Sequence, residues 1–238
     1  NNEISIEFLK QLKLNKIPKL YYLNLSNINE TFSMSILNDW TTSILYIDLS
    51  HNFLKINNIF MKYATNLQNI FLSHTKLEDF DMKYFNFSLF SNLMSIDLSH
   101  NRLTIIKSSF FSKNIFLDFA YLSFNSIELI EPNSFQNNLM ILDVSFNNLK
   151  KFDTNIFISG YQENLKVFLN NNKLEEISTF FSMNYLEKNF LTKIPHLNDY
   201  DKKIKIKVLN LNKNRISSIS DELIVNNFRE VEQIRLRN

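Results

Sequence analysis

One pattern of apolar residues recurs along almost the whole chain and constrains its fold more than any other feature. Two copies, Leu93–Ile106 and Ile206–Ile219, carry apolar residues at positions 1, 4, 6, 11 and 14 and an Asn at position 9. Copies of this frame begin at residues 20, 44, 67, 93, 117, 139, 164, 181, 206 and 231. A period of this length predicts a stack of similar structural units.

The pattern has a direct physical interpretation. Positions 4 and 6 lie on one face of a short strand because side chains alternate in direction along a strand, and positions 11 and 14 fold back to cover them. A single repeat cannot bury these residues alone, so neighbouring repeats must share one continuous core. Positions 2, 3, 5, 7 and 8 are then left to face solvent.

The Asn at position 9 is predicted to be structural. Its amide can donate and accept hydrogen bonds, and it lies where the chain turns inward and leaves backbone groups that need partners. The predicted row consists of Asn52, Asn101, Asn125, Asn147, Asn172, Asn189 and Asn214.

Some copies depart from the frame. Ile28 and Thr75 stand where Asn is expected, and the copy around Leu186 follows its predecessor after only 17 residues. We expect distorted turns at Ile28 and in the short copy. The frame is broken off at both ends, which predicts a segment excerpted from a longer protein without its capping modules.

These copies resemble the leucine-rich-repeat consensus L-x-x-L-x-L-x-x-N-x-L over nearly the whole chain. The resemblance implies an α/β repeat solenoid: a curved horseshoe with a parallel β-sheet on its concave face and irregular or short helical segments on its convex side. It implies one domain over residues 1–238 with nine to ten repeats. Phe135, Phe157 and the pair Phe110 and Phe111 fall late in their repeats and are expected to pack as a row inside the convex half.

Composition excludes several classes of function. A single Gly, Gly160, rules out Gly-rich phosphate loops, and the absence of Cys removes disulfides and thiolate sites. A net charge of +2 does not favour nucleic acid, and no apolar run is long enough to insert this segment into a membrane. We predict no cofactor and no bound metal.

The outward positions of the strands are the candidate binding surface. Tyr and Phe are favoured in interfaces, and their clustering in the copies beginning at 117 and 139 is unusual for a sheet facing solvent. Glycan cover or codon usage are the alternative explanations. The candidate ligand-binding residues are Tyr46, Asp48, Phe71, Asp97, Phe119, Tyr121, Phe124, Asp143, Phe146, Phe168 and Tyr185.

The same face has a charge gradient, with Asp residues in the first copies and Lys and Arg in the last ones. Three of the four histidines, His51, His74 and His100, occupy position 8 of consecutive copies. Neighbouring imidazoles repel one another when protonated, so this row is a candidate pH sensor. A metal site is not expected, because the rings would have to tilt together to converge on one ion.

Two further motifs carry little weight. Asp48, Ser50 and His51 include the residue types of a hydrolase triad, but they are consensus positions at the wrong spacing, and we predict no enzyme activity. The glycosylation sequons at Asn24, Asn29 and Asn86 are no more numerous than an Asn-rich sequence produces by chance.

The repeat class resembles animal surface proteins such as Toll-like receptor ectodomains and chaoptin-like adhesion proteins. This resemblance implies an extracellular, membrane-attached glycoprotein acting in recognition, adhesion or signal transduction, with a protein ligand or co-receptor as partner. The alternative is a cytoplasmic scaffold or regulatory subunit, which the absence of Cys favours. A catalytic domain outside the segment is a third possibility. The sequence does not predict an oligomeric state.

Overall fold

The computed structural model describes ten segments of the chain. These are residues 19–28, 31–33, 43–55, 64–85, 87–108, 110–158, 164–177, 183–194, 207–217 and 231–237, together with the single residues 11, 17 and 160.

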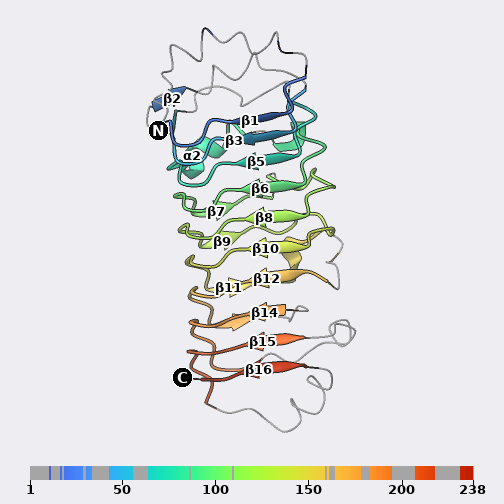
Figure 1. Ribbon diagram of the computed structural model, residues 1–238. Coiled ribbons are helices and arrows are strands. Elements are labelled where there is room, and N and C mark those ends of the chain that lie inside the picture. The colour runs from blue at the N-terminus through green and yellow to red at the C-terminus, as the bar shows by residue number, and fades with distance from the viewer. Residues whose placement is uncertain are drawn as a thin grey trace.

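The main element is a parallel sheet of ten short strands, each contributed by a different copy of the repeat (Figure 1). Neighbouring strands pair in one constant register, so position 3 of each repeat lies beside position 3 of the next, as in Tyr22 beside Tyr46. In order across the sheet, the strands are β1 (Tyr22–Asn24), β3 (Tyr46–Asp48), β5 (Asn69–Phe71), β6 (Ser95–Asp97), β8 (Phe119–Tyr121), β10 (Ile141–Asp143), β12 (Lys166–Phe168), β14 (Met183–Tyr185), β15 (Val208–Asn210) and β16 (Gln233–Arg235).

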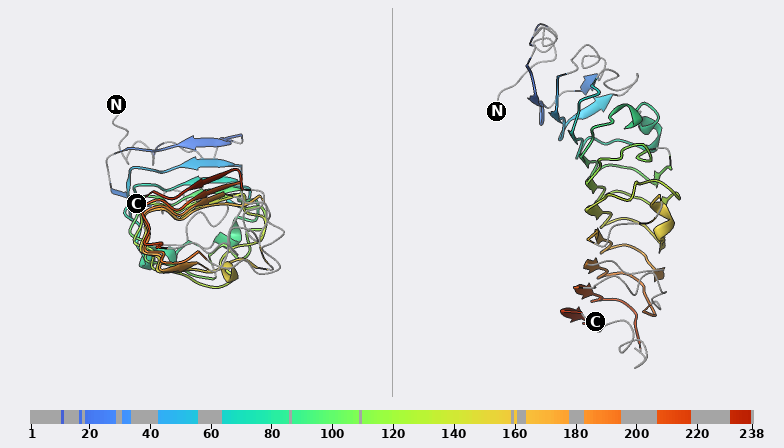
Figure 2. Two further views of the ribbon diagram at one scale, coloured as in Figure 1. Left: turned by 90° about the horizontal axis from the view of Figure 1, so that it is seen from below. Right: turned by 90° about the vertical axis from the view of Figure 1, so that its right-hand side faces the viewer.

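The predicted solenoid is therefore confirmed: the chain coils around one core, and the sheet lines the inner side of an arc (Figure 2). The opposite side is irregular; among the described residues it holds one helical turn, α2 (Asp79–Met82), and two 3-10 turns, η3 (Phe87–Leu89) and η4 (Thr154–Ile156). It also holds short parallel strand pairs that the repeat pattern did not predict. These pairs are β2 (Thr31–Ser33) with β4 (Phe53–Lys55), β7 (Ile105–Ile106) with β9 (Leu129–Ile130), and β11 (Lys151–Phe152) with β13 (Glu176–Ile177).

The apolar positions of the repeat form one continuous core. In the copy that begins at Leu93, the side chains of Ile96, Leu98, Leu103 and Ile106 are all completely buried. The equivalent residues of neighbouring copies belong to the same cluster. Each repeat thus completes the burial of the next, as the stacking argument requires.

The expected phenylalanine row is also confirmed. Phe111 stacks on Phe135 with ring centroids 5.4 Å apart, and Phe135 contacts Phe157 at 6.3 Å. The row extends one residue further than expected, because the centroid of Phe87 lies 5.0 Å from that of Phe111. These rings belong to the same buried core as the aliphatic side chains of the strands.

The Asn side chains at position 9 connect each repeat to the preceding one. Asn147 donates to the carbonyl oxygen of Val144 in its own repeat (3.1 Å) and to that of Leu122 in the repeat before it (2.9 Å). Its Oδ1 accepts the amide of Ile127 at 2.8 Å. All seven residues of the predicted row donate to the two equivalent carbonyl groups, and six accept the equivalent amide, whereas Asn52 accepts the amide of Ile28 at position 9. The seven residues are Asn52, Asn101, Asn125, Asn147, Asn172, Asn189 and Asn214.

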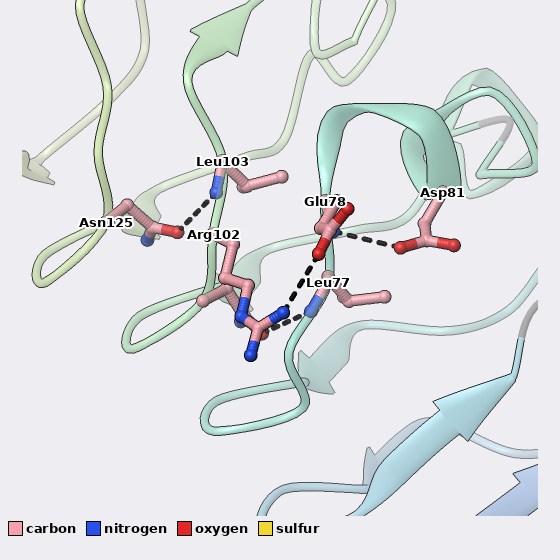
Figure 3. A network of polar contacts seen from close by, with 7 residues as sticks. Leu77, Glu78, Asp81, Arg102, Leu103 and Asn125 are labelled. Carbon is pink, nitrogen blue, oxygen red and sulfur yellow. Dashed lines mark hydrogen bonds and ion pairs between the residues drawn. The ribbon is translucent and has the colours of Figure 1, made fainter.

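Figure 3 shows how these inner bonds continue into surface contacts. Oδ1 of Asn125 accepts the amide of Leu103, while the neighbouring Arg102 forms an ion pair of 3.0 Å with Glu78. The amide of Glu78 in turn donates to Asp81 at the start of α2. The ion pair is exposed and contributes little to stability, whereas the bonds of Asn125 are part-buried and those of Asn101 and Asn147 are buried.

The expectation of distorted turns is wrong at both places. Asn27 and Lys188, which precede position 9 in the two irregular copies, have the same φ of 56°. Where Asn is replaced, the position-9 amide itself donates to the next repeat: Ile28 to Asn52 at 2.8 Å and Thr75 to Asn101 at 3.1 Å. The Oδ1 atom of the Asn in the next repeat thus accepts the turn amide, and the turn geometry is preserved.

Candidate functional site

The candidate site is the outward side of the ten-stranded sheet, which we call the concave face. The aspartates Asp48, Asp97 and Asp143 and most of the predicted aromatic residues are half-buried there, so part of each side chain remains accessible. Phe124 and Phe146 are more exposed, at 43% and 38%. The constant register places position 5 of every strand in one row, and this row contains Asp48, Phe71, Asp97, Tyr121, Asp143, Phe168 and Tyr185.

Aromatic rings stack at both ends of this face. Tyr22 stacks on Tyr46 with centroids 4.1 Å apart, and the Tyr46 ring lies 5.0 Å from that of Phe71. Burial, together with a hydrogen bond to Tyr22, raises the pKa of Tyr46 to about 12. Farther along, Phe168 stacks on Tyr185 at 4.6 Å. These rings present flat apolar surface with a polar edge at each Tyr hydroxyl, a combination suited to protein interfaces.

A longer stack runs along the carboxyl ends of the strands. The rings of His51, His74, His100, Phe124 and Phe146 lie face to face, with successive centroids 4.3, 4.0, 4.2 and 4.1 Å apart. We call these five residues the ring stack. All five occupy position 8, three residues beyond the end of a strand, and each has a positive φ between 54° and 57°.

The backbone at every residue of the ring stack is left-handed. Positive φ is uncommon for residues other than Gly, although Asn and His tolerate it better than Phe does. This chain fills its position-8 turns with Asn, His, Phe and Lys. The stacking of neighbouring rings at about 4 Å offsets part of the strain at Phe124 and Phe146.

His74 lies between two other imidazoles. Burial lowers its pKa below the ordinary value of 6.5, and the charges of His100 and His51 lower it further, whereas Asp97 acts in the opposite direction. Adding a proton to the stack therefore becomes harder once a neighbour is charged. This geometry agrees with the pH-sensing hypothesis, which stays a prediction.

The aspartates of position 5 are held in fixed orientations. Oδ1 of Asp143 accepts the amide and hydroxyl of Ser145 at 3.0 and 2.7 Å, and Oδ1 of Asp97 accepts the amide of Ser99 at 2.8 Å. At Asp48 the hydroxyl of Ser50 points to the carboxylate at 2.6 Å. The hydroxyl of Ser50 therefore donates to Asp48, whereas in a hydrolase triad the Ser hydroxyl is hydrogen-bonded to the His.

The opposite end of the concave face is basic. From β12 onward, positions 2, 3, 5, 7 and 8 carry two acidic residues, Glu187 and Glu232. The basic residues at these positions are Lys166, Lys188, Lys207, Lys213, Arg235 and Arg237, and we call this set the basic end.

A groove at the amino ends of the strands was missed by the sequence analysis. It has a volume of about 420 Å³, and its lining includes Met94, Phe116 and Asp118. Ile115 and Phe116 are 56% and 52% exposed. The signal available in the sequence was the alternation of Met94, Asp118 and Met140 at position 2. Tyr22 was missed as well, although it stands at position 3 of the copy that begins at residue 20.

Of the three sequons, Asn24 is the one whose position the structure describes; Asn29 and Asn86 lie outside the described residues. The Asn24 side chain is exposed at position 5 of β1, and its Oδ1 accepts the amide of Ser26 at 2.9 Å. A glycan at Asn24 would stand on the concave face beside Asp48.

Within the described segments, no group of three or more His, Asp or Glu side chains is arranged to hold a metal ion. No helix in these segments has both the length and the hydropathy needed to cross a bilayer.

Comparison with known proteins agrees with this architecture. Residues 92–114 match the family model of the leucine-rich repeat. The chain folds as a leucine-rich-repeat solenoid. No curated protein sequence matched it.

Several solved structures superpose on this solenoid. The leucine-rich repeat domain of APL1B has a TM-score of 0.72 at 15% identity, covering 99% of this chain and 69% of that one. The APL1 domain has a TM-score of 0.60 at 17% identity, covering 92% and 72%. An internalin (inlF) from Listeria monocytogenes has a TM-score of 0.57 at 15% identity, covering 90% and 68%. At these identities the similarity concerns the fold alone.

Proposed function

We propose that this solenoid is the recognition segment of a cell-surface receptor or adhesion protein and that its concave face binds a protein partner. Leucine-rich-repeat folds commonly mediate protein–protein interaction and are typically scaffolds without enzyme activity. The observation that carries the proposal is the set of accessible aromatic rings on the concave face, led by Phe124 and Phe146. Singly exposed apolar residues are ordinary, whereas rings gathered on one face favour an interface.

Site-specific crosslinking tests the binding face. A photoreactive phenylalanine at Tyr121 or Phe168 is expected to crosslink a partner in cells that produce the protein. The same probe at Leu129 is the matched control, because Leu129 is 50% exposed on the convex side. Crosslinks from Leu129 but from neither concave position would overturn the proposal.

Alanine variants test the same face by affinity. Tyr121→Ala combined with Phe168→Ala removes two half-buried rings from different strands and is expected to weaken capture of the crosslinked partner while the fold is retained. Circular dichroism checks the fold. Unchanged capture would remove these two residues from the binding surface.

Cellular location is tested separately. The repeat class supports the cell surface, and the absence of Cys favours the alternative of a cytoplasmic scaffold. Antibody labelling of intact cells that make the full-length protein is expected to give the same signal before and after permeabilisation. A signal that appears only after permeabilisation would establish the scaffold alternative.

A further inference from the structure

The charges on the concave face are divided between its two ends. Over β3, β5, β6, β8 and β10, positions 2, 3, 5 and 8 contain neither Lys nor Arg. The same positions contain four carboxylates, those of Asp48, Asp97, Asp118 and Asp143. We call this part of the face the acidic–aromatic half, and it lies beside the basic end of the same sheet. A charged partner is therefore attracted to one half and repelled by the other.

The centre of the acidic–aromatic half contains an aromatic ring flanked by two carboxylates. Asp97, Tyr121 and Asp143 occupy position 5 of the adjacent strands β6, β8 and β10. Neighbouring strands are about 4.8 Å apart, so both carboxylates lie within reach of a group placed over the Tyr ring. Burial and the negative charges of both aspartates raise the pKa of Tyr121, which agrees with this proximity.

These carboxylates are oriented in advance. The hydrogen bonds from Ser99 and Ser145 use Oδ1 of Asp97 and of Asp143. Within the described segments no hydrogen bond or ion pair is made to Oδ2 of either residue, and this oxygen stays available as an acceptor. The flat guanidinium of Arg can stack on an aromatic ring and donate hydrogen bonds to a carboxylate at the same time. The ammonium of Lys can lie over the ring as a compact charge and pair with the same carboxylate.

The groove at Asp118 also combines a carboxylate with apolar surface. Its apolar walls include Met94, Ile115 and Phe116, and its one charged group is the carboxylate of Asp118. Long basic side chains bury their methylene stems on apolar surface while their charged ends stay near water or a counter-ion. An Arg or Lys side chain therefore matches both the walls and the charge of this groove.

We propose that the acidic–aromatic half binds a cationic polypeptide segment of a protein partner, with one Arg or Lys side chain in the Asp118 groove and another over Tyr121. This inference rests on the proposed recognition function and specifies the chemistry of the partner. Nucleic acids and anionic lipid surfaces are repelled by the four carboxylates. Free metal ions and small amines would leave the apolar walls and rings in contact with water, whereas a polypeptide segment covers them.

Peptide binding provides the first test. A fluorescent peptide of alternating Arg and Ser is titrated with the protein, and an uncharged peptide of alternating Gln and Ser serves as the control. We expect binding of the Arg peptide alone, and we expect it to weaken as salt is raised, because the contacts are accessible to screening ions. No binding of the Arg peptide, or equal binding of the Gln peptide, would overturn the proposal.

Variants that remove charge without removing shape locate the site. Asp97→Asn with Asp143→Asn retains an Oδ1 acceptor for each serine, and the chain already uses Asn24 and Asn210 in the same turn bond. We expect this pair to weaken peptide binding about tenfold and Asp118→Asn alone to weaken it about threefold.

Matched controls remove the same charge from the convex side. Glu128 and Glu175 are exposed, occupy position 12 of their repeats and lie away from the concave face. Glu128→Gln is the control for Asp118→Asn, and Glu128→Gln with Glu175→Gln is the control for the double variant. We expect less than about a twofold change from either. Equal weakening by the controls would show attraction by net charge alone and would overturn the proposed site.

A second copy of this chain, with its own basic end, is the competing occupant. Sedimentation at rising protein concentration is expected to show no self-association that depends on Asp97 and Asp143. Self-association abolished by the double Asn variant would overturn the claim of a separate partner.

Failure of this inference can be distinguished from failure of the proposed function. A partner that crosslinks to Tyr121 but binds the double Asn variant at full strength would leave concave recognition intact and overturn its cationic chemistry. A partner that crosslinks only at Leu129 would overturn both.

Discussion

Positions 8 and 9 are neighbours in every turn, yet they behave in opposite ways. Position 9 faces inward, and its Asn side chains make the same bonds from Asn52 to Asn214. Position 8 faces outward on an equally constant backbone, with φ between 54° and 57°, but its residue changes from His to Phe, Asn and Lys along the coil. The backbone is thus determined by the inner row, and the outer row is free to vary in chemistry.

This comparison explains how one solenoid can carry two opposite surface charges. The carbonyl groups between stacked repeats need a partner at every turn, so the inner residue is Asn in most repeats. Where it is Ile28 or Thr75, the Asn of the next repeat bonds to the turn amide. The outer residue contacts solvent and its own neighbours. Lys188 and Lys213 of the basic end have a φ of 56°, which lies within the range of 54° to 57° found for the His and Phe residues of the ring stack.

Removing an inner ring should have the largest effect. Phe111 is completely buried and contacts both Phe87 and Phe135, so Phe111→Ala is expected to cost roughly 3–5 kcal/mol of unfolding free energy. Urea unfolding followed by circular dichroism measures it. Phe124→Asn is the outer control: it retains a residue that tolerates positive φ and should cost less than about 1 kcal/mol. Similar losses for the two variants would contradict the division into inner and outer rows.

The Asn row should rank next. Asn147→Ala leaves the Ile127 amide and the carbonyl groups of Leu122 and Val144 without their Asn partner, and we expect a loss of about 2–3 kcal/mol. Asn171→Gly, at position 8 of the following repeat, should change stability by less than about 1 kcal/mol, because Gly adopts positive φ freely. Amide exchange should rise in the repeats on either side of Asn147 but not around Asn171.

On the outer face, a charge can be removed without unfolding the coil. Asp143→Asn keeps an acceptor for the amide of Ser145, and we expect its unfolding free energy to stay within about 0.5 kcal/mol of the unmodified chain. The same urea experiment measures it. A loss as large as that of Asn147→Ala would mean that position 5 is part of the structural lattice and not a free binding surface.

The smallest predicted effect is the pH response of the ring stack. Since the pKa of His74 is lowered in the folded state, the unfolded chain binds this proton first as pH falls below 6.5. Stability contributed by the neutral ring is therefore lost between pH 6.5 and the lower folded pKa, and His74→Asn should remove that slope. In NMR titrations, His100→Asn should raise the pKa of His74 toward 6.5, because it removes a repelling charge. A pKa that stays the same would exclude coupling through the stack.

Much of the inner architecture could be predicted from residue spacing. The strand register, the Asn row and the phenylalanine row follow from a period that aligns equal positions of successive repeats, as with Phe111, Phe135 and Phe157. The expected distortion at Ile28 was wrong, because the Oδ1 atom of Asn52 in the next repeat satisfies that turn. Such compensation crosses repeats and is invisible within any single copy.

The sequence by itself determined the coil, since only stacking can bury a lattice of apolar residues that no single repeat can enclose. It also placed the outward residues on one face, through the period of two along each strand. Tertiary structure alone decided which of those residues touch: the five-ring contact from His51 to Phe146 and the groove around Asp118 depend on the turn conformation and on side-chain packing between repeats. Those contacts join residues about one repeat apart in the sequence, so the distance between their side chains is not determined by the local backbone conformation.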